Sequence, residues 1–503
     1  MPKISTTLYP YQERDIAYLF RELETSTPDR RLLYQLPTGG GKTVIFSEIA
    51  RRFIAKYSRK VAILTHRSEL CSQTSATLTH FGVPNDVIES ATKLPDLSSD
   101  CAIAMVETLK HRIKEGKIST ADVGLVIIDE AHHNAFRKLL KKFRHSYVIG
   151  VTATPFSSDI SKPMNAHYHA LISGDSIADL IAGGFLAKPQ SVAYDVELNS
   201  LTTGIHGDFT ISSSNALYGS PAMLQLLLDA YHSHADGRKT LIFNNGIDTS
   251  LKVHAAFTEA GIPIRHLDNN TGAEDRKAIL QWFRKTKGAV LTSVSILTTG
   301  FDEPTVQAVI LNRATTSVTL YHQMIGRGAR RLPAKKTFRI IDLGNNMKRF
   351  GDWDAPMDWQ HVFENPAAYA AQLNYSATAT AGESHRIPAE IRTQFPNTLE
   401  FAFDVAAHYE EAVEHHKKPK TVIQDSLRQQ ALMCLDNADT VTEALKLASA
   451  LQPEIEWRVK SYVKCIGNAS KSYKDWLLAD YMQRLDTLIP KLYRLRNRQQ
   501  NAV

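Results

Sequence analysis

The segment Leu36–Thr43 constrains the fold of this chain most. It reads Leu-Pro-Thr-Gly-Gly-Gly-Lys-Thr, follows an apolar run that includes Leu32 and Leu33, and precedes a helical pattern from Val44 to Ile54. Where a strand, a glycine turn and a helix follow one another, backbone N–H groups face one centre and the helix N-terminus adds positive potential. The sequence therefore predicts a phosphate-binding loop in an α/β domain.

The residue types of this loop suit a nucleotide triphosphate with Mg²⁺. We expect Lys42 to reach the β- and γ-phosphates and Thr43 to ligate the metal. Upstream, Gln12 starts a helix, and its amide has the donor and the acceptor that an adenine edge requires. Leu36 replaces the first glycine of the general pattern, so a plain glycine-rich turn is the alternative, as is a solvated glutamine for Gln12. The predicted nucleotide-binding residues here are Gln12, Thr38, Gly39, Gly40, Gly41, Lys42 and Thr43.

Length and composition favour a globular protein of several domains. A chain of 503 residues is too long for one core, and roughly three domains are expected. No apolar run approaches the roughly 20 residues that cross a membrane, and the first residues resemble neither a signal peptide nor an Arg-rich leader. We therefore expect a cytoplasmic protein without membrane contact. The four cysteines form no C-x-x-C pair, so we expect small core residues and no zinc.

A second motif follows a strongly apolar run. Val123–Ile128 has the composition of a central parallel strand and is followed by Asp129 and Glu130. Adjacent carboxylates at a buried strand end are costly unless a cation or a reaction needs them. Asp129 would hold Mg²⁺ and Glu130 would orient and deprotonate a water; a solvated acidic turn is the alternative. The hydroxyls of Thr152–Thr154, after the strand Tyr147–Val151, would bond to this acidic motif.

Two further strands end in polar residues. The strand Val61–Leu64 leads into Thr65 and Arg67, and the strand Ala102–Val106 leads into Thr108. In parallel α/β sheets, ligands bind where strands end and helices begin. We expect Thr65, Arg67 and Thr108 to contact nucleic acid, while a structural salt bridge is the alternative for Arg67.

A second α/β segment lacks a phosphate loop of its own. Its predicted strands are Thr240–Phe243, Pro263–Leu267, Ala289–Thr292, Ala308–Leu311 and Phe338–Ile341. A turn with Gly300 and Asp302 follows the third strand, which is a typical place for a ligand loop. Arg327 and Arg330 lie three apart on a predicted helix and share one face. Two arginines on one face repel unless an anion lies opposite, and a γ-phosphate reached across a domain cleft would satisfy them.

The C-terminal part is predicted to be helical and carries the excess positive charge. The helices expected are Thr421–Asn437, Val441–Leu451, Glu454–Ile466 and Tyr473–Tyr493. From Trp457 to Val503 there are ten Lys/Arg and three Asp/Glu, while the rest of the chain is balanced at 49 of each. Arg494, Arg496 and Arg498 would form a surface that tracks phosphates. A solvated helix face, or a flexible tail that any polyanion attracts, is the alternative.

In this order the motifs resemble superfamily 2 helicases of the DEAD/DEAH type. The residues that carry the resemblance are Gln12, Gly39–Thr43, Asp129–His132, Thr152–Thr154, Thr298–Asp302 and Gln323–Arg330. Leu-Thr-Thr-Gly-Phe-Asp-Glu-Pro and Tyr-His-Gln-Met-Ile-Gly-Arg-Gly look most like the RadD-like branch, whose wider relatives are UvsW, the XPB-type helicases and restriction-enzyme motors. The resemblance covers roughly residues 8–345; the C-terminus lacks the zinc cysteines usual in RadD-like proteins.

The resemblance implies an α/β fold with two tandem RecA-like parallel-sheet domains, followed by an all-helical C-terminal domain. The expected boundaries are 1–195 for the first domain, 196–221 for a linker, 222–350 for the second domain, 351–398 for a connecting segment and 399–503 for the helices. ATP and Mg²⁺ would lie between the two domains, and Gly300 and Asp302 would approach the nucleotide. Arg327 and Arg330 would be arginine fingers, with Gln323 beside the γ-phosphate.

The implied function is that of an ATP-dependent DNA helicase or translocase acting on single-stranded or branched DNA, in repair or recombination. An ATP-gated clamp, or a motor subunit that does not unwind DNA by itself, is one alternative. An RNA helicase is the other. The helical C-terminus would offer a surface to partner proteins.

Overall fold

The computed structural model describes residues 8–28, 30–90, 98–157, 159, 162–198, 200–204, 208–294, 296–297, 301–370, 373, 403, 405–414, 418–466 and 471–500. The chain divides into two compact units. The α/β unit comprises residues 1–196 and 221–376, and the helical unit comprises residues 197–220 and 377–503. Within the described ranges, no helix combines the length and the apolar character needed to cross a membrane.

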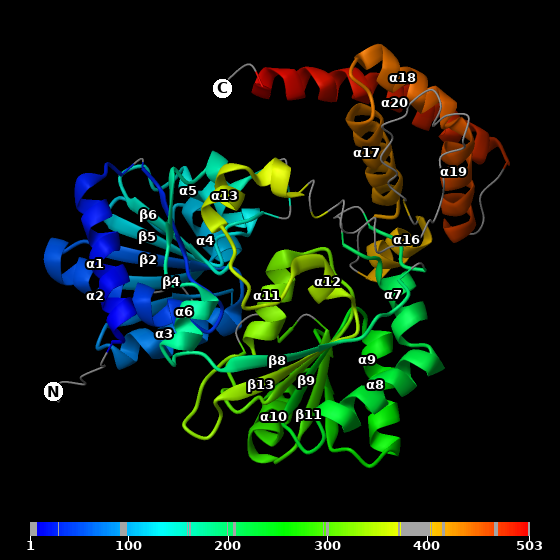
Figure 1. The fold of residues 1–503 in the computed structure, drawn as a ribbon. Helices are drawn as coiled ribbons and strands as arrows, with labels where there is room; N and C mark the ends of the chain where they lie inside the picture. The colour runs from blue at the N-terminus through cyan, green and yellow to red at the C-terminus, as the bar shows by residue number, and fades with distance from the viewer. Residues whose placement is uncertain are drawn as a thin grey trace. The chain divides into compact units, whose positions relative to one another are not determined.

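The first half of the α/β unit is a seven-stranded parallel sheet with the strand order β3-β4-β2-β5-β6-β1-β7 (Figure 1). Its strands are β1 Leu32–Gln35, β2 Lys60–Thr65, β3 Asn85–Ile88, β4 Cys101–Met105, β5 Val123–Asp129, β6 Tyr147–Thr152 and β7 Ala170–Ser173. Alternate residues of the central strands enter two different buried clusters: Leu125 and Ile127 pack on one face, Val126 and Ile128 on the other. Both faces of the sheet are covered at β5, which explains why β5 is apolar along almost its whole length.

Helices flank this sheet on both faces. They are α1 Pro10–Thr25, α2 Lys42–Tyr57, α3 Ser68–His80, α4 Val106–Lys114, α5 Arg137–Leu140 and α6 Ile177–Ala182, with short 3₁₀ turns at η1 Asn134–Phe136 and η2 Met164–Ala166. The first three helices cover the sheet face that contains Leu125, through Ile16, Phe46 and Cys71. Leu109 of α4 and Leu139 of α5 pack on the opposite face, which contains Val126.

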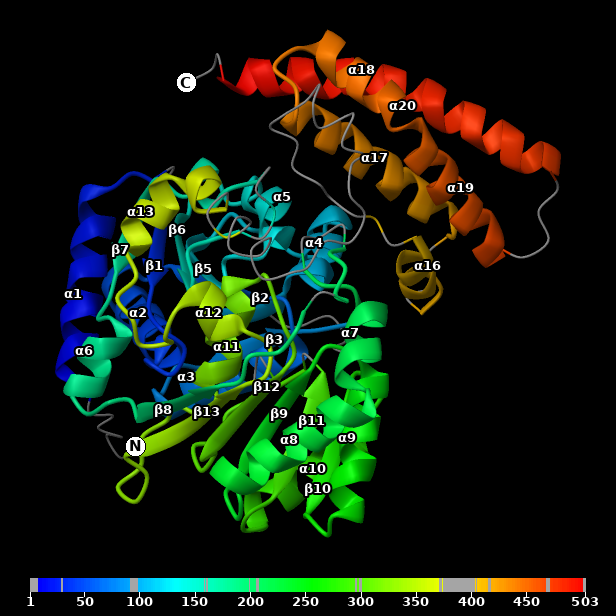
Figure 2. The same ribbon diagram turned by 45° about the vertical axis from the view of Figure 1, so that its right-hand side comes forward.

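The second half of the unit is a six-stranded parallel sheet with the order β10-β11-β9-β12-β13-β8 (Figure 2). Its strands are β8 Lys188–Ala193, β9 Thr240–Asn244, β10 Ile264–Leu267, β11 Val290–Val294, β12 Ala308–Asn312 and β13 Thr337–Asp342. The helices of this half are α8 Pro221–His234, α9 Ile247–Glu259, α10 Ala273–Lys285, α11 Val318–Gly326 and α12 Asn346–Phe350. The next helix, α13 Trp359–Glu364, packs instead against β7 of the first sheet. β8 pairs with β13, so the second sheet takes a strand from before residue 195, where the sequence placed the end of the first domain.

The helical unit is held together by its own apolar core. It contains α7 Ile211–Tyr218, α16 Val405–Glu414, α17 Lys420–Asp436, α18 Val441–Ala450, α19 Gln452–Ile466 and α20 Lys471–Gln500. Leu427, Leu447, Val459 and Tyr481, from four of these helices, lie in one buried cluster, and α20 runs along the others (Figure 2). Residues 197–220, which include α7 and fall in the predicted linker, group with this unit. The predicted fold class, two parallel-sheet domains followed by C-terminal helices, is confirmed.

Candidate nucleotide site

The predicted phosphate loop lies between β1 and α2, at the carboxyl end of the first sheet. Gly39 and Gly41 have left-handed backbones, with φ of 100° and 83°, which glycine adopts without strain. A Cβ atom at Gly41 would stand 2.6 Å from Nε2 of Gln12. Gly41 is also the N-cap of α2, and no side chain caps that helix end. Uncapped N–H groups at a helix N-terminus favour an anion, which suits a phosphate.

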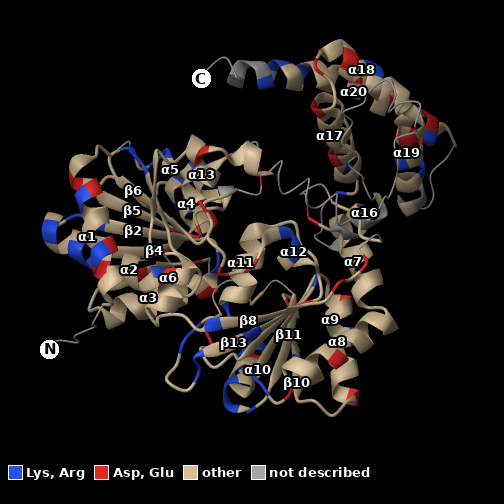
Figure 3. Ribbon diagram, viewed as in Figure 1, with Lys and Arg blue, Asp and Glu red and all other residues tan. Residues whose placement is uncertain are grey.

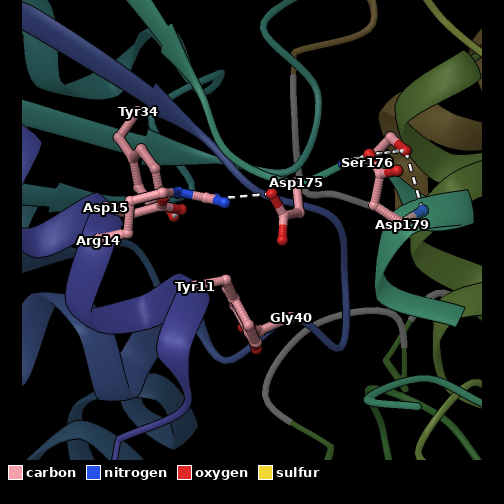
Figure 4. Close-up of polar contacts among 8 residues, drawn as sticks. All are labelled: Tyr11, Arg14, Asp15, Tyr34, Gly40, Asp175, Ser176 and Asp179. Atoms are coloured by element: carbon pink, nitrogen blue, oxygen red, sulfur yellow. Dashed lines mark hydrogen bonds and ion pairs between the residues drawn. The ribbon is translucent and has the colours of Figure 1, made fainter. Parts of the chain in front are cut away.

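The flanking helix α1 is fixed to the loop by polar contacts (Figure 4). The hydroxyl of Tyr11 donates to the carbonyl of Gly40 at 2.7 Å. Gln12 is buried; its Oε1 accepts from the N–H of Tyr9 at 3.0 Å, and its Nε2 lies 3.4 Å from the hydroxyl of Tyr11. The amide of Gln12 therefore lies beside the loop, as expected for a base contact, but it also caps its own helix.

A buried carboxylate network lies one turn further along α1 (Figure 4). Asp15 accepts a hydrogen bond from the hydroxyl of Tyr34 at 2.7 Å and pairs with Arg14 at 2.8 Å. The same guanidinium reaches Asp175 at 2.6 Å. Burial raises the pKa of Asp15, and the bonds from Tyr34 and Arg14 oppose that rise. This network joins α1, β1 and the end of β7 behind the phosphate loop.

The acidic pair lies at the end of β5 and is buried, with 5% exposure for Asp129 and 7% for Glu130. Glu130 has a left-handed backbone with φ of 51°, a conformation that costs a non-glycine residue on the order of 1–3 kcal/mol. Burial and the neighbouring Glu130 raise the pKa of Asp129 to about 7, against the opposing effect of Lys42. Burial also lowers the pKa of Lys42, whose Nζ donates to the carbonyl of Leu36 at 3.2 Å.

The hydroxyl of Thr152 contacts the acidic motif through His132. Nδ1 of His132 lies 3.1 Å from Oγ1 of Thr152 and 3.3 Å from Oε2 of Glu130. Burial lowers the pKa of His132 well below its usual value, which favours the neutral imidazole beside Glu130. Thr154 instead donates to Oγ1 of Thr319 in the second domain, at 2.8 Å.

Helix α11 brings the second domain onto these residues. Nε2 of Gln323 lies 3.4 Å from Oε2 of Glu130. A Cβ atom at Gly326 would stand 2.5 Å from Cβ of Thr38, so only a glycine lets the end of α11 approach the phosphate loop this closely. Sequence reasoning assigned no role to Gly326, because this approach joins residues that are far apart in the sequence.

The two arginines follow α11, which ends at Gly326, so the prediction that they share one helix face is wrong, and they are held in different ways. Arg327 donates to the carbonyl of Phe301 at 2.6 Å, and burial, assisted by Arg330, lowers its pKa to about 10. Arg330 pairs through Nε with Asp302 at 2.9 Å. Its Nη1 would stand 3.1 Å from a Cβ atom at Gly39, so the guanidinium lies against the phosphate loop. Asp302 thus contacts the arginine, and Gly300 lies outside the described residues.

The residues expected to contact nucleic acid have varied environments. Thr65 ends β2, and its buried hydroxyl has no hydrogen-bond partner within the described part of the chain. Arg67 is the half-buried N-cap of α3, and with the described residues it forms no ion pair, which disfavours the salt-bridge alternative. Thr108 is half-buried in α4. Structure alone assigns none of the three to a ligand.

The predicted cations of the C-terminus lie on α20 (Figure 3). Arg494 is exposed, whereas Arg496 pairs with Asp436 at 3.0 Å and also reaches the carbonyl of Leu435. These residues are helical, so the alternative of a flexible tail is wrong for 494–500; the side chain of Arg498 lies outside the described residues. Of the cysteines expected in the core, three are buried and Cys465 is partly exposed.

The residues present fit the two groups that the sequence implies. The cradle of Gly39–Gly41 would hold phosphates, and the ammonium of Lys42 would lie beside them. The described residues contain no group of three or more His, Cys, Asp or Glu that could hold a metal ion. Mg²⁺ usually takes one or two protein ligands and completes its shell with phosphate oxygens and water. Thr43 and Asp129 would be those ligands.

Family models match both halves of the α/β unit. "Type III restriction enzyme, res subunit" matches residues 5–157, and "Helicase conserved C-terminal domain" matches residues 221–331. The first range contains the phosphate loop and the acidic pair, and the second contains Gln323 and both arginines. Each family model therefore contains one part of the candidate site, the first in the domain with the seven-stranded sheet and the second in the domain with the six-stranded sheet.

Individual proteins extend the likeness. "Putative ATP-dependent helicase IRC3" of Saccharomyces cerevisiae is 32% identical over 67% of this chain and 51% of its own length. A "51.5 kDa protein" of a Lactococcus phage is 30% identical over 68% of this chain and 72% of its own length. The chain thus spans about half the length of the first relative.

A solved structure shares the fold. "The fragment structure of a putative HsdR subunit of a type I restriction enzyme from Vibrio vulnificus YJ016" superposes with a TM-score of 0.56 and 24% identity, over 69% of this chain and 67% of the fragment. Two tandem RecA-like domains, the paired family models and the relatives agree. The chain belongs to the superfamily 2 helicases.

Proposed function

We propose that this protein hydrolyses ATP between its two RecA-like domains and uses the cycle to move along or remodel DNA. The observation that carries the proposal is the contact between Gln323 and Glu130 across the domains, at 3.4 Å. This contact brings Glu130, which would polarise water, together with the helix that precedes both arginines. Chemistry of this kind depends mainly on positioning and on stabilising negative charge.

The residues of the candidate site would have separate roles in hydrolysis. The phosphate loop and Lys42 would orient the triphosphate, and Mg²⁺ would neutralise its charge when bound. Glu130 would accept a proton from the attacking water, and Gln323, beside it, would orient that water. Arg327 and Arg330 would approach the charge that develops on the γ-phosphate. Opening of the domains after hydrolysis would separate these groups and change the grip on the strand.

DNA is the favoured substrate. The family model that matches the first domain is named for a restriction enzyme, a class of enzyme that acts on DNA. The motif wording around Gly300 and Gly326, which resembles the RadD-like branch, points to DNA as well, and a role in repair or recombination forms part of this proposal. An ATP-gated clamp would need no efficient turnover, so the complete set of Glu130, Arg327 and Arg330 favours the motor.

One assay separates these functions. ATP hydrolysis is measured with no nucleic acid and with single-stranded DNA, duplex DNA, forked DNA or RNA, each at saturating concentration. We expect stimulation by at least one DNA and less by RNA. Strand separation and displacement of a bound protein are followed on the same substrates. Stimulation by RNA alone would reverse the substrate assignment, and ATP binding without stimulated hydrolysis would favour the clamp.

A further inference from the structure

The connection between the two RecA-like domains makes contacts that the nucleotide chemistry above does not use. The chain leaves α6 at Gly183 and enters β8 at Lys188. We call residues Phe185–Ala187 of this connection the strap. The N–H groups of Phe185 and Leu186 both donate to the carbonyl of Leu180, at 2.8 and 3.1 Å. The strap is therefore anchored to the first domain at its start.

Phe185 packs against the start of α1. Its ring centroid lies 4.7 Å from that of Tyr9 and 4.8 Å from that of Tyr11, with interplanar angles of 51° and 60°. These distances and tilts are typical of attractive aromatic pairs. Tyr11 in turn donates to the carbonyl of Gly40. Phe185 is thus connected through one side chain to the phosphate loop.

The next two residues contact the loop and the arginine segment directly. A Cβ atom at Gly39 would stand 2.9 Å from Cδ2 of Leu186, so this side chain lies on the loop. Leu186 forms an antiparallel bridge with Arg330, and the N–H of Ala187 donates to the carbonyl of Ala329 at 2.8 Å. The strap therefore restrains the backbone of Arg330 beside Gly39.

We propose that the strap positions Arg330 over the phosphate loop, and that Phe185 is the residue that fixes the strap. This inference rests on the proposed hydrolysis of ATP. Among the described residues, the side chain of Arg330 pairs with Asp302, and both side chains are partly exposed, at 28% and 46%. A single exposed pair holds a guanidinium weakly. The backbone contacts of the strap supply the restraint that this pair lacks.

The first test removes the ring. Phe185→Ala should lower the kcat of DNA-stimulated hydrolysis by about 10- to 100-fold, the scale of a displaced catalytic group. The KM for ATP should change much less, because the phosphate loop remains intact. Phe185→Tyr, which keeps the ring, should restore kcat. Tyr18→Ala is the matched control: Tyr18 is an exposed aromatic residue of the same helix α1, and its loss should leave kcat unchanged.

A second test asks whether Phe185 acts through Arg330. In an Arg330→Ala background, Phe185→Ala should have little further effect on the single-turnover rate of hydrolysis. A residue that merely stabilises the fold would add its loss in both backgrounds. Phe185→Leu, which keeps apolar bulk without the ring, replaces the alanine variant if thermal unfolding shows that the latter is not folded.

The outcomes distinguish this inference from the proposed function. A wild-type protein without nucleic-acid-stimulated hydrolysis overturns the proposed function. An active wild type in which Phe185→Ala or Phe185→Leu keeps full kcat overturns the role of the strap alone. Equal losses in the wild-type and Arg330→Ala backgrounds also overturn it, because they place Phe185 outside the path to Arg330.

Discussion

The two RecA-like domains share an architecture but contribute different chemistry to the candidate site. The first domain presents its polar groups directly at strand ends: the phosphate loop follows β1, Asp129 ends β5 and Glu130 comes directly after it. The second domain presents Gln323, Arg327 and Arg330 from one helix and the turn after it. One domain thus offers a cradle, a lysine and carboxylates, and the other offers mainly cations.

This difference implies a division between binding and turnover. The first domain holds the groups that would bind the nucleotide in the ground state. The second would contribute where charge develops during hydrolysis, and its contribution depends on domain closure. Variants of the first domain's loop should therefore alter ATP affinity, and variants of the second domain's arginines should alter kcat.

The largest expected effect is that of Arg330→Ala. Loss of an arginine finger lowers turnover by about 10³-fold or more, while ATP affinity should change little because the loop belongs to the other domain. Stimulated hydrolysis and equilibrium binding of a fluorescent ATP analogue measure the two quantities. The matched control is Arg238→Ala. Arg238 is exposed and lies just before β9, at the amino end of that strand. Comparable losses of affinity and turnover would contradict the division.

Glu130→Gln should have the next largest effect. The amide keeps the shape of the side chain but cannot accept the proton, so kcat should fall by roughly 10²-fold or more. ATP binding should be retained. Glu115→Gln, on an exposed glutamate of the same domain, serves as the control. Near-normal hydrolysis by Glu130→Gln would mean that the acidic pair has another role.

Disruption of the carboxylate network around Asp15 should lower stability more than turnover. This result would separate structural residues of the first domain from those that bind the nucleotide. Asp15→Ala leaves the buried hydroxyl of Tyr34 without its acceptor. An unsatisfied buried group costs about 1–3 kcal/mol, so the free energy of unfolding in denaturant should fall by that amount. Tyr34→Phe tests the partner. If the double variant loses as much stability as the two single variants together, the hydrogen bond contributes nothing.

The sequence predicted the centres of both sheets but not all of their edges. Apolar runs indicated β1, β2, β4, β5, β6 and the strands from β9 onward. The strands β3, β7 and β8 were not predicted, and each lies at the end of its sheet's strand order. An edge strand needs less apolar surface, and β8 contains Lys188, Pro189 and Gln190, residues that a central strand would exclude.

The candidate site was predictable where its residues are close in sequence. The phosphate loop and the acidic pair are short motifs with a local physical reason. Contacts that depend on the meeting of distant segments were not predictable: Gly326 against Thr38, Asp302 with Arg330, and Leu186 on Gly39. A glycine at the end of a predicted helix, such as Gly326, indicates that another segment approaches closely, but the sequence does not identify that segment.

The smallest expected effect concerns α20 and asks whether DNA binding extends beyond the two RecA-like domains. Deletion of residues 494–503 should leave basal hydrolysis intact and weaken DNA binding. The plot of log K against log salt concentration should become shallower, by about one unit for each phosphate that the protein no longer neutralises.

Point variants distinguish the contributions of the two arginines. Arg494 is exposed, so Arg494→Gln should reduce the salt slope at unchanged stability. Arg496 is paired with Asp436, so Arg496→Gln should mainly lower the unfolding free energy, by at most about 1 kcal/mol for an exposed pair. An unchanged salt slope in both the deletion and Arg494→Gln would make the end of α20 a helical cap without a role in DNA binding.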